Sequence, residues 1–178
     1  KEAFDVPIWS GSPSADRVLK DGEILQLGNQ EWIVLHTPGH HPEHLCLISE
    51  SGLVAGDMVA GIGTILIPPG QGDMMTYINQ LERLLDLDPH LIFPSHGPVI
   101  PLPERTLEHY IRHRSIRHDK VLAAVEEGNS DLQKIAKIAY EDTPDAHPGL
   151  AVDQTLSHLL SHEKDGNVKR VDDGWVRA

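Results

Sequence analysis

The sequence predicts an α+β protein with a strand-rich first part and a helical second part. Short runs rich in β-branched and aromatic residues, bounded by Gly, Pro or Asp, recur before residue 100 and indicate strands. From residue 104 onward, apolar residues recur at helical spacing instead. We therefore expect two units, residues 1–103 and residues 104–178.

The first part combines strand segments with one helical segment. Strands are expected at residues 31–35, 45–48, 53–55 and 91–93. Between the last two strands, apolar residues from Met74 to Leu87 recur every three or four positions, and Pro89 marks the end of this helix. The pattern predicts a sheet crossed by one helix.

The second part has the pattern of three helices followed by a β-hairpin. A long helix is expected over residues 107–126, and a third helix from about residue 150 to residue 162. Between these two helices, Ser130 and Gln133 form a capping-box pattern, so a second helix is expected to begin at Ser130. This order is typical of a winged-helix domain, which we expect to dock on the first part through its long helix.

The hairpin is expected at the end of the chain. Asp173-Gly174 is a hairpin turn signal between two apolar segments. Trp175 is expected to pack inward beneath this turn, because a large aromatic side chain stabilises a short hairpin through cross-strand contacts.

Composition limits the classes of partner. The 178 residues carry a net charge of −12, which repels phosphate backbones unless a local basic patch exists. A basic stretch does occur on the long helix, and we interpret it as a solvated face, with contact to an anionic substrate as the alternative. It consists of His113, Arg114, Arg117, His118 and Lys120.

Targeting and redox features are few. No apolar run approaches the roughly 18 residues that a membrane span needs, so no membrane partner is expected. The single Cys46 lies in an apolar run and is expected to be a buried, inert thiol. These features fit a cytoplasmic protein. The chain begins at Lys1 rather than Met, which suggests a fragment or a processed chain.

Three short motifs each place a potential metal ligand directly after an expected strand. Each lies on a turn made by Gly or Pro, and loops at strand ends are where rigid scaffolds present reactive groups. Imidazole and carboxylate groups suit zinc, manganese or iron, and two adjacent metal ions can activate a shared water. The motifs are His36-Thr37-Pro38-Gly39-His40, Gly56-Asp57 and Pro94-Ser95-His96-Gly97-Pro98.

These motifs, in this order, resemble the metallo-β-lactamase superfamily. The resemblance implies that His40 binds one metal ion, that Asp57 bridges two ions and is catalytic, and that His96 binds the second ion. It implies zinc as the cofactor and hydrolysis by metal-activated water. It also implies that residues 1–103 are the second half of a four-layer αββα sandwich, with a winged-helix domain at residues 104–178.

A closer resemblance is to the lactamase-beta-like protein 2 group, which includes a single-strand-specific endoribonuclease and thioesterase-like hydrolases. The resemblance implies a small-molecule ester or thioester substrate, with single-stranded RNA as the alternative. A third hypothesis is a non-catalytic module that only binds a partner. The matching segments are Leu19-Lys20-Asp21-Gly22, Gly61-Ile62-Gly63-Thr64, His113-Arg114-Ser115-Ile116-Arg117 and Tyr140-Glu141-Asp142-Thr143-Pro144.

The sequence departs from the family pattern in one respect. The family signature H-x-H-x-D-H, which supplies further ligands, is not found before His40. We therefore expect the chain by itself to bind metal weakly and to be inactive. Half a sandwich also cannot cover its own sheet, so an exposed apolar face and a possible homo-oligomer are expected. The candidates for that face are Trp9, Trp32, Val34, Leu45 and Leu47.

Overall fold

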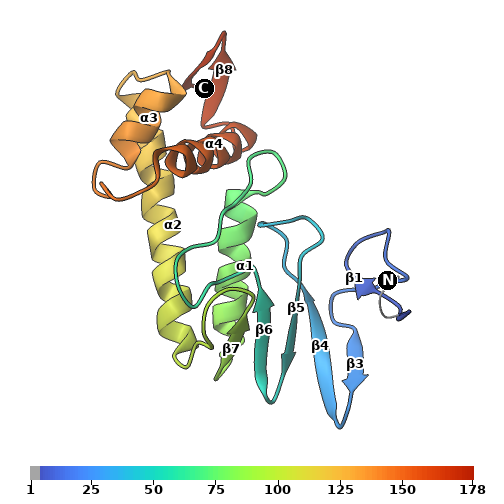
Figure 1. Ribbon diagram of the computed structural model, residues 1–178. Coiled ribbons are helices and arrows are strands. Elements are labelled where there is room, and N and C mark those ends of the chain that lie inside the picture. Colours follow the sequence, from blue (N-terminus) through green and yellow to red (C-terminus); the bar gives the residue numbers. More distant parts are fainter. Residues whose placement is uncertain (1–4) are drawn as a thin grey trace.

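The computed structural model describes residues 5–178 and has an α+β architecture (Figure 1). A five-stranded sheet has the order β3-β4-β5-β6-β7, in which β3 to β6 are antiparallel neighbours and β7 runs parallel to β6. A separate parallel pair lies near the N-terminus and consists of β1 (Trp9–Ser10) and β2 (Arg17–Val18). The sheet strands are β3 (Ile24–Leu27), β4 (Gln30–His36), β5 (Leu45–Ser49), β6 (Gly52–Gly56) and β7 (Ile92–Pro94).

Helix α1 (Met74–Asp86) connects β6 to β7 and covers one face of the sheet (Figure 1). Asp73 caps it by accepting a hydrogen bond of 2.8 Å from the backbone N–H of Thr76. Its apolar stripe is buried against inward-facing strand residues, so the periodicity read from the sequence corresponds to a core-facing helix. Cys46 belongs to this core and is a buried, free thiol as expected.

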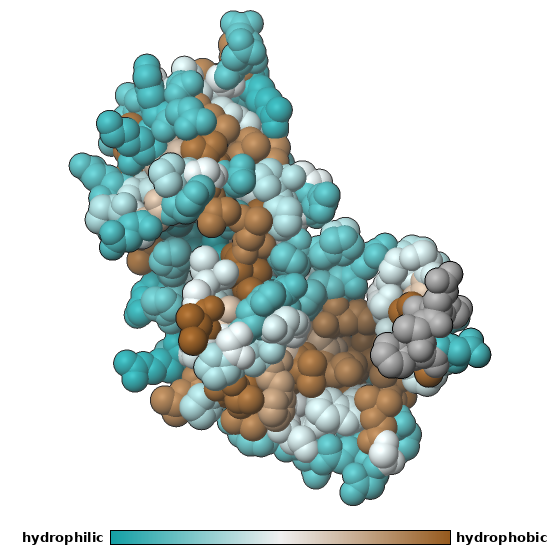
Figure 2. Space-filling view, in the orientation of Figure 1, coloured by the Kyte–Doolittle hydropathy of each residue, from teal (hydrophilic) through white to brown (hydrophobic). Residues whose placement is uncertain are grey.

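The opposite face of the sheet is partly covered. Val34 is fully buried together with Leu19 and Leu25, whereas Trp32 and its neighbours on β5 are only half-buried. The expectation of an exposed face was therefore wrong for Val34, because the segment before β3 folds back over it. Trp9 is exposed, and Figure 2 shows an apolar area remaining over this part of the sheet.

The second part contains the expected three helices and hairpin. The order observed is α2 (Pro103–Glu126), α3 (Leu132–Ala139), α4 (Pro148–Lys164), β8 (Val168–Val171) and β9 (Gly174–Arg177). Helix α2 packs along α1, and its residues Leu107 and Tyr110 enter the core of the first part. Whether this part is a winged-helix domain, and whether the chain divides at residue 103, stay predictions.

The start of α3 differs from the expected capping box. Asp131 caps this helix by accepting a 3.0 Å hydrogen bond from the backbone N–H of Lys134. The carbonyl of Ser130 instead accepts a 2.9 Å bond from the backbone N–H of Trp175. The Ser130 prediction was wrong because this residue belongs to the contact between helix and hairpin. Trp175 is buried in the second core, as expected.

Most of the basic stretch of α2 is buried, although His113 is exposed and Lys120 is half-buried. Arg114, Arg117 and His118 are all buried, because this side of α2 packs against α4 and the loops beneath it. The prediction of a solvated face was therefore wrong for these three residues. Arg117 forms an ion pair of 2.8 Å with Asp142, which compensates part of its desolvation.

A buried trio of histidines joins α2 to α4. The Nδ1 atoms of His118 and His158 lie 3.1 Å apart, and the rings of His118 and His162 stack with centroids 3.6 Å apart. Burial lowers the pKa of His118 to about 4 and holds the pKa of His158 well below its usual value. Burial also lowers the pKa of His162. The trio is therefore uncharged at neutral pH.

Within residues 5–178, no helix combines the length and the apolar character that crossing a membrane requires.

Candidate metal centre

The topology brings the three candidate ligands to one edge of the sheet. Strands β4 and β6 are both antiparallel to β5, and β7 is parallel to β6, so all three strands end at the same edge. His40 lies in the loop after β4, Asp57 directly follows β6, and His96 lies just beyond β7. The carboxyl ends of three strands therefore present these side chains together.

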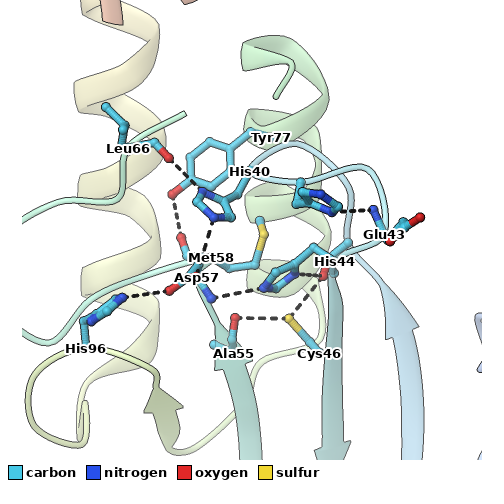
Figure 3. A network of polar contacts seen from close by, with 12 residues as sticks. His40, Glu43, His44, Cys46, Ala55, Asp57, Met58, Leu66, Tyr77 and His96 are labelled. Carbon is cyan, nitrogen blue, oxygen red and sulfur yellow. Dashed lines mark hydrogen bonds and ion pairs between the residues drawn. The ribbon is translucent and has the colours of Figure 1, made fainter. Parts of the chain in front are cut away.

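The two imidazoles converge on the two oxygens of one carboxylate (Figure 3). His40 Nε2 lies 3.5 Å from Asp57 Oδ2, and His96 Nε2 lies 3.2 Å from Asp57 Oδ1. Asp57 Oδ1 is buried yet accepts no hydrogen bond of good geometry within the described chain. A buried carboxylate oxygen without a donor is costly unless a cation is near, so this atom is suited to a positive ligand.

The protonation pattern of His40 also favours a cation at this place. His40 Nδ1 lies 2.7 Å from the carbonyl oxygen of Leu66, which can only accept, so Nδ1 carries a proton. In the neutral imidazole, Nε2 then directs a lone pair toward Asp57 Oδ2. These two atoms are both electron-pair donors, so a second proton or a metal ion between them would give each a partner.

The described chain does not supply a complete metal site. Across residues 5–178, no group of three or more His, Cys, Asp or Glu side chains is arranged to enclose one metal ion. The geometry explains this, because His40 and His96 approach different oxygens of Asp57. That arrangement matches a carboxylate shared between two positions, each with one imidazole and each incomplete.

A chain of directed hydrogen bonds fixes the backbone of Asp57. Its N–H donates to His44 Nε2 at 3.0 Å, so the proton of this imidazole sits on Nδ1 and is donated to Thr37 Oγ1 at 2.8 Å. Thr37 Oγ1 lies 3.3 Å from Cys46 Sγ, whose S–H donates to the carbonyl of Ala55. Burial lowers the pKa of His44 to about 4, which keeps the acceptor nitrogen unprotonated at neutral pH.

Two glycines allow this close packing. Gly56 has φ +52°, and a Cβ at this position would lie 2.5 Å from His44 Nε2. Gly39 has φ +138°, and its Cβ would lie 2.4 Å from the Cα of Tyr77 at the start of α1. Glycine is therefore required at both places by conformation and by space.

A hollow of about 390 Å³ opens beside the three side chains. It is lined by His40, Asp57 and His96 on one side and by residues 60 and 62–66 on the other. The sequence motifs identified the three candidate ligands. They did not identify the carbonyl of Leu66, because a backbone acceptor leaves no trace in side-chain patterns. His44 was only one of several loop histidines in the sequence.

Comparison with known proteins agrees with this architecture. Residues 5–96 match the family model described as the metallo-beta-lactamase superfamily. The Drosophila melanogaster beta-lactamase-like protein 2 homolog is 36% identical over 140 residues, which cover 76% of this chain and 47% of the relative. The atrochrysone carboxyl ACP thioesterase AgnL7 of Paecilomyces divaricatus is 25% identical over 155 residues, covering 85% of this chain and 48% of the relative.

A solved structure extends the likeness to nearly the whole chain. The beta-lactamase domain protein from Burkholderia ambifaria superposes with a TM-score of 0.79 at 26% identity, covering 93% of this chain and 53% of that chain. The chain thus spans about half the length of the proteins it matches. The family match over residues 5–96, which contain all three candidate ligands, shows that this chain belongs to the metallo-β-lactamase superfamily.

Proposed function

We propose that this chain carries one part of a two-metal hydrolytic site, with His40, Asp57 and His96 as its ligands. The observation that carries the proposal is the convergence of two imidazole nitrogens on the two oxygens of Asp57, at 3.5 and 3.2 Å. Asp57 Oδ1 has no hydrogen-bond donor within the described chain. The proton of His40 lies on Nδ1, which leaves Nε2 as a free electron-pair donor. Both features fit a divalent cation such as zinc.

Each residue has a separate role in this proposal. His40 and His96 would each hold an ion through Nε2, and the Asp57 carboxylate would serve as the ligand between them. When bound, such ions activate water for attack and polarise the scissile carbonyl. The hydrogen bond from His40 Nδ1 to Leu66 keeps the ligand nitrogen directed at the site. The network around His44 keeps the Asp57 backbone in place.

The substrate class we propose is an ester or thioester. Support comes from the relative named as an ACP thioesterase, and from the net charge of −12, which disfavours a long polyanionic substrate. Since the chain spans about half of its relatives, the reaction belongs to a protein that also supplies the remaining ligands. The single chain is proposed to bind metal weakly and to turn over no substrate.

The metal-binding part is tested by titrating zinc into the 178-residue chain by calorimetry. A weak site is expected, and Asp57→Asn should abolish it because one neutral amide cannot balance two cations. Asp86→Asn on α1 is the matched control, since Asp86 is exposed and lies outside the site. Equal zinc binding by the two variants would show that the ligands lie elsewhere.

The proposed hydrolysis is tested on the protein that also supplies the remaining ligands, purified as its gene encodes it. We expect hydrolysis of acyl thioesters in the presence of zinc, and loss of most turnover in Asp57→Asn. Cleavage of single-stranded RNA by the same preparation, without thioester turnover, would reassign the protein as a ribonuclease. Neither activity, together with retained zinc binding, would favour a non-catalytic module.

We further propose that residues 104–178 form a winged-helix module that serves packing and not nucleic-acid binding. The support is the order of three helices and hairpin, and the exposed acidic residues around the hairpin and the start of α3. A mobility-shift titration with duplex DNA should show no complex at physiological salt. The acidic residues are Glu126, Glu127, Asp131, Asp172 and Asp173.

A further inference from the structure

A loop between the sheet and α1 holds the hydrogen-bond acceptor for His40. This loop, residues 60–67, is held mainly by side chains of the C-terminal helices. Tyr110 on α2 accepts a 3.0 Å bond from the N–H of Ala60 and donates to the carbonyl of Gly63 at 3.2 Å. The first half of the loop is therefore fixed by α2.

The second half of the loop is fixed by a buried pair of side chains. Arg114 on α2 donates to Thr64 Oγ1 at 2.8 Å and to the carbonyl of Ile65. It also donates to Gln154 Oε1 on α4 at 3.0 Å. Both side chains are more than nine-tenths buried, and the three oxygens that Arg114 bonds are all neutral. Arg114 therefore orients the amide of Gln154.

The side-chain amide of Gln154 forms hydrogen bonds with both backbone polar groups of one loop residue, Ile67. Its Oε1 accepts a 3.2 Å bond from the N–H of Ile67, and its Nε2 donates to the carbonyl of Ile67 at 2.9 Å. Ser157 on the same helix donates to that carbonyl at 2.7 Å. The N–H of Ile67 belongs to the same planar peptide unit as the carbonyl of Leu66.

That peptide unit links α4 to the candidate metal centre. Its N–H end is held by Gln154, and its C=O end accepts the proton of His40 Nδ1 at 2.7 Å. Because the unit is rigid and planar, a tilt at the N–H end moves the oxygen that His40 requires. The acceptor that selects the His40 tautomer thus depends on a side chain of the C-terminal helices.

We propose that Gln154 is a positioning residue for the metal ligand His40, acting through the Leu66–Ile67 peptide unit and supported by Arg114. The role of His40 as a ligand rests on the proposed function, but its orientation by Gln154 does not. Removing a hydrogen bond that orients a ligating histidine typically weakens metal binding about 10–100-fold. The C-terminal helices therefore contribute to the site without supplying a ligand.

The test compares three variants of the 178-residue chain. Gln154→Leu keeps the approximate volume and removes both hydrogen bonds to Ile67. Gln154→Glu loses the donor to the carbonyl of Ile67, to which Ser157 still donates, but keeps the acceptor for the N–H of Ile67 and for Arg114, so the His40 tautomer should be retained. Thr155→Val is the matched control, because the buried Thr155 hydroxyl donates to the carbonyl of Ala151 within α4 and, among residues 5–178, to no part of the 60–67 loop.

The first readout is the His40 tautomer in the metal-free chain, from the ¹⁵N shifts of its imidazole. The native chain, Gln154→Glu and Thr155→Val should show the proton on Nδ1, and Gln154→Leu should shift it toward Nε2. The His44 imidazole, held by Thr37 and the Asp57 N–H, should be unchanged in every variant. An unchanged His40 tautomer in a folded Gln154→Leu chain overturns the proposal.

The second readout is zinc titration followed on the same imidazole signals. About 10–100-fold weaker binding is expected for Gln154→Leu alone. A tautomer shift in a chain that binds no zinc supports the positioning role and counts against the proposed function, so the two can fail separately. If Gln154→Leu does not fold, Gln154→Met, whose unbranched side chain is closer in shape to Gln, also removes the acceptor for the N–H of Ile67 and should give the same shift. No shift there overturns the proposal.

Discussion

Replacing Trp175 with Ala should destabilise the second part of the chain without touching the candidate metal centre. The Trp175 side chain is 5% exposed and lies in the core formed by α2, α3, α4 and the hairpin. Truncating a buried Trp to Ala costs about 3–5 kcal/mol. For a chain of this length, that corresponds to a melting temperature lower by about 6–20 °C.

The assay is thermal unfolding followed by circular dichroism, with zinc titration of the folded variant beside it. Trp175→Phe is the comparison variant. It keeps an aromatic ring in the core, so its melting temperature should fall less than that of Trp175→Ala. The backbone bond from Trp175 to Ser130 is retained in both variants. An unchanged melting temperature combined with lost zinc binding would refute the reasoning, because it would place the hairpin in the site itself.

Three further predictions follow from local geometry. Because burial lowers the pKa of His118 to about 4, this residue binds a proton in the unfolded chain before it does in the folded chain as the pH falls below 6.5. The free energy of unfolding should then fall by about 1.4 kcal/mol per pH unit on account of His118 down to about pH 4, and urea midpoints independent of pH would contradict this. Gly56→Ala should lower the melting temperature more than Gly22→Ala, since both have positive φ but only the Cβ at Gly56 meets another side chain. Tyr110→Phe should cost about 1–3 kcal/mol in urea unfolding by leaving the buried N–H of Ala60 without its acceptor, and a change below the error of the measurement would exclude that bond.

Local patterns were sufficient for strands β4 to β7 and for α1, whereas strand β3 was not predicted. Strand segments bounded by turn residues, and the helical spacing after Met74, were reproduced because both signals depend on near neighbours. The start of α3 was misplaced for a related reason. Ser130 and Asp131 are both good capping residues, and contact with Trp175 decided between them.

The burial of polar residues was harder to predict from the sequence. Arg114 and His118 are buried against α4, and Arg117 is buried against the segment after α3, yet their charge suggested solvent. Val34 was assigned to an open face because the segment that covers it gave no pattern of its own. In each case the deciding partner lies far along the chain, where periodicity carries no information.

The sequence by itself determined the family, the strand–turn motifs and the identity of His40, Asp57 and His96 as candidate ligands. The ligand residues and the turns that position them lie within short segments of sequence, so both can be predicted from local patterns. Only the tertiary structure decided how the site is held. The hydrogen bonds of Gln154 with Ile67 connect residues 87 positions apart, and His40 donates to the backbone oxygen of Leu66. Neither contact has a side-chain signature, because chain folding alone brings these groups together.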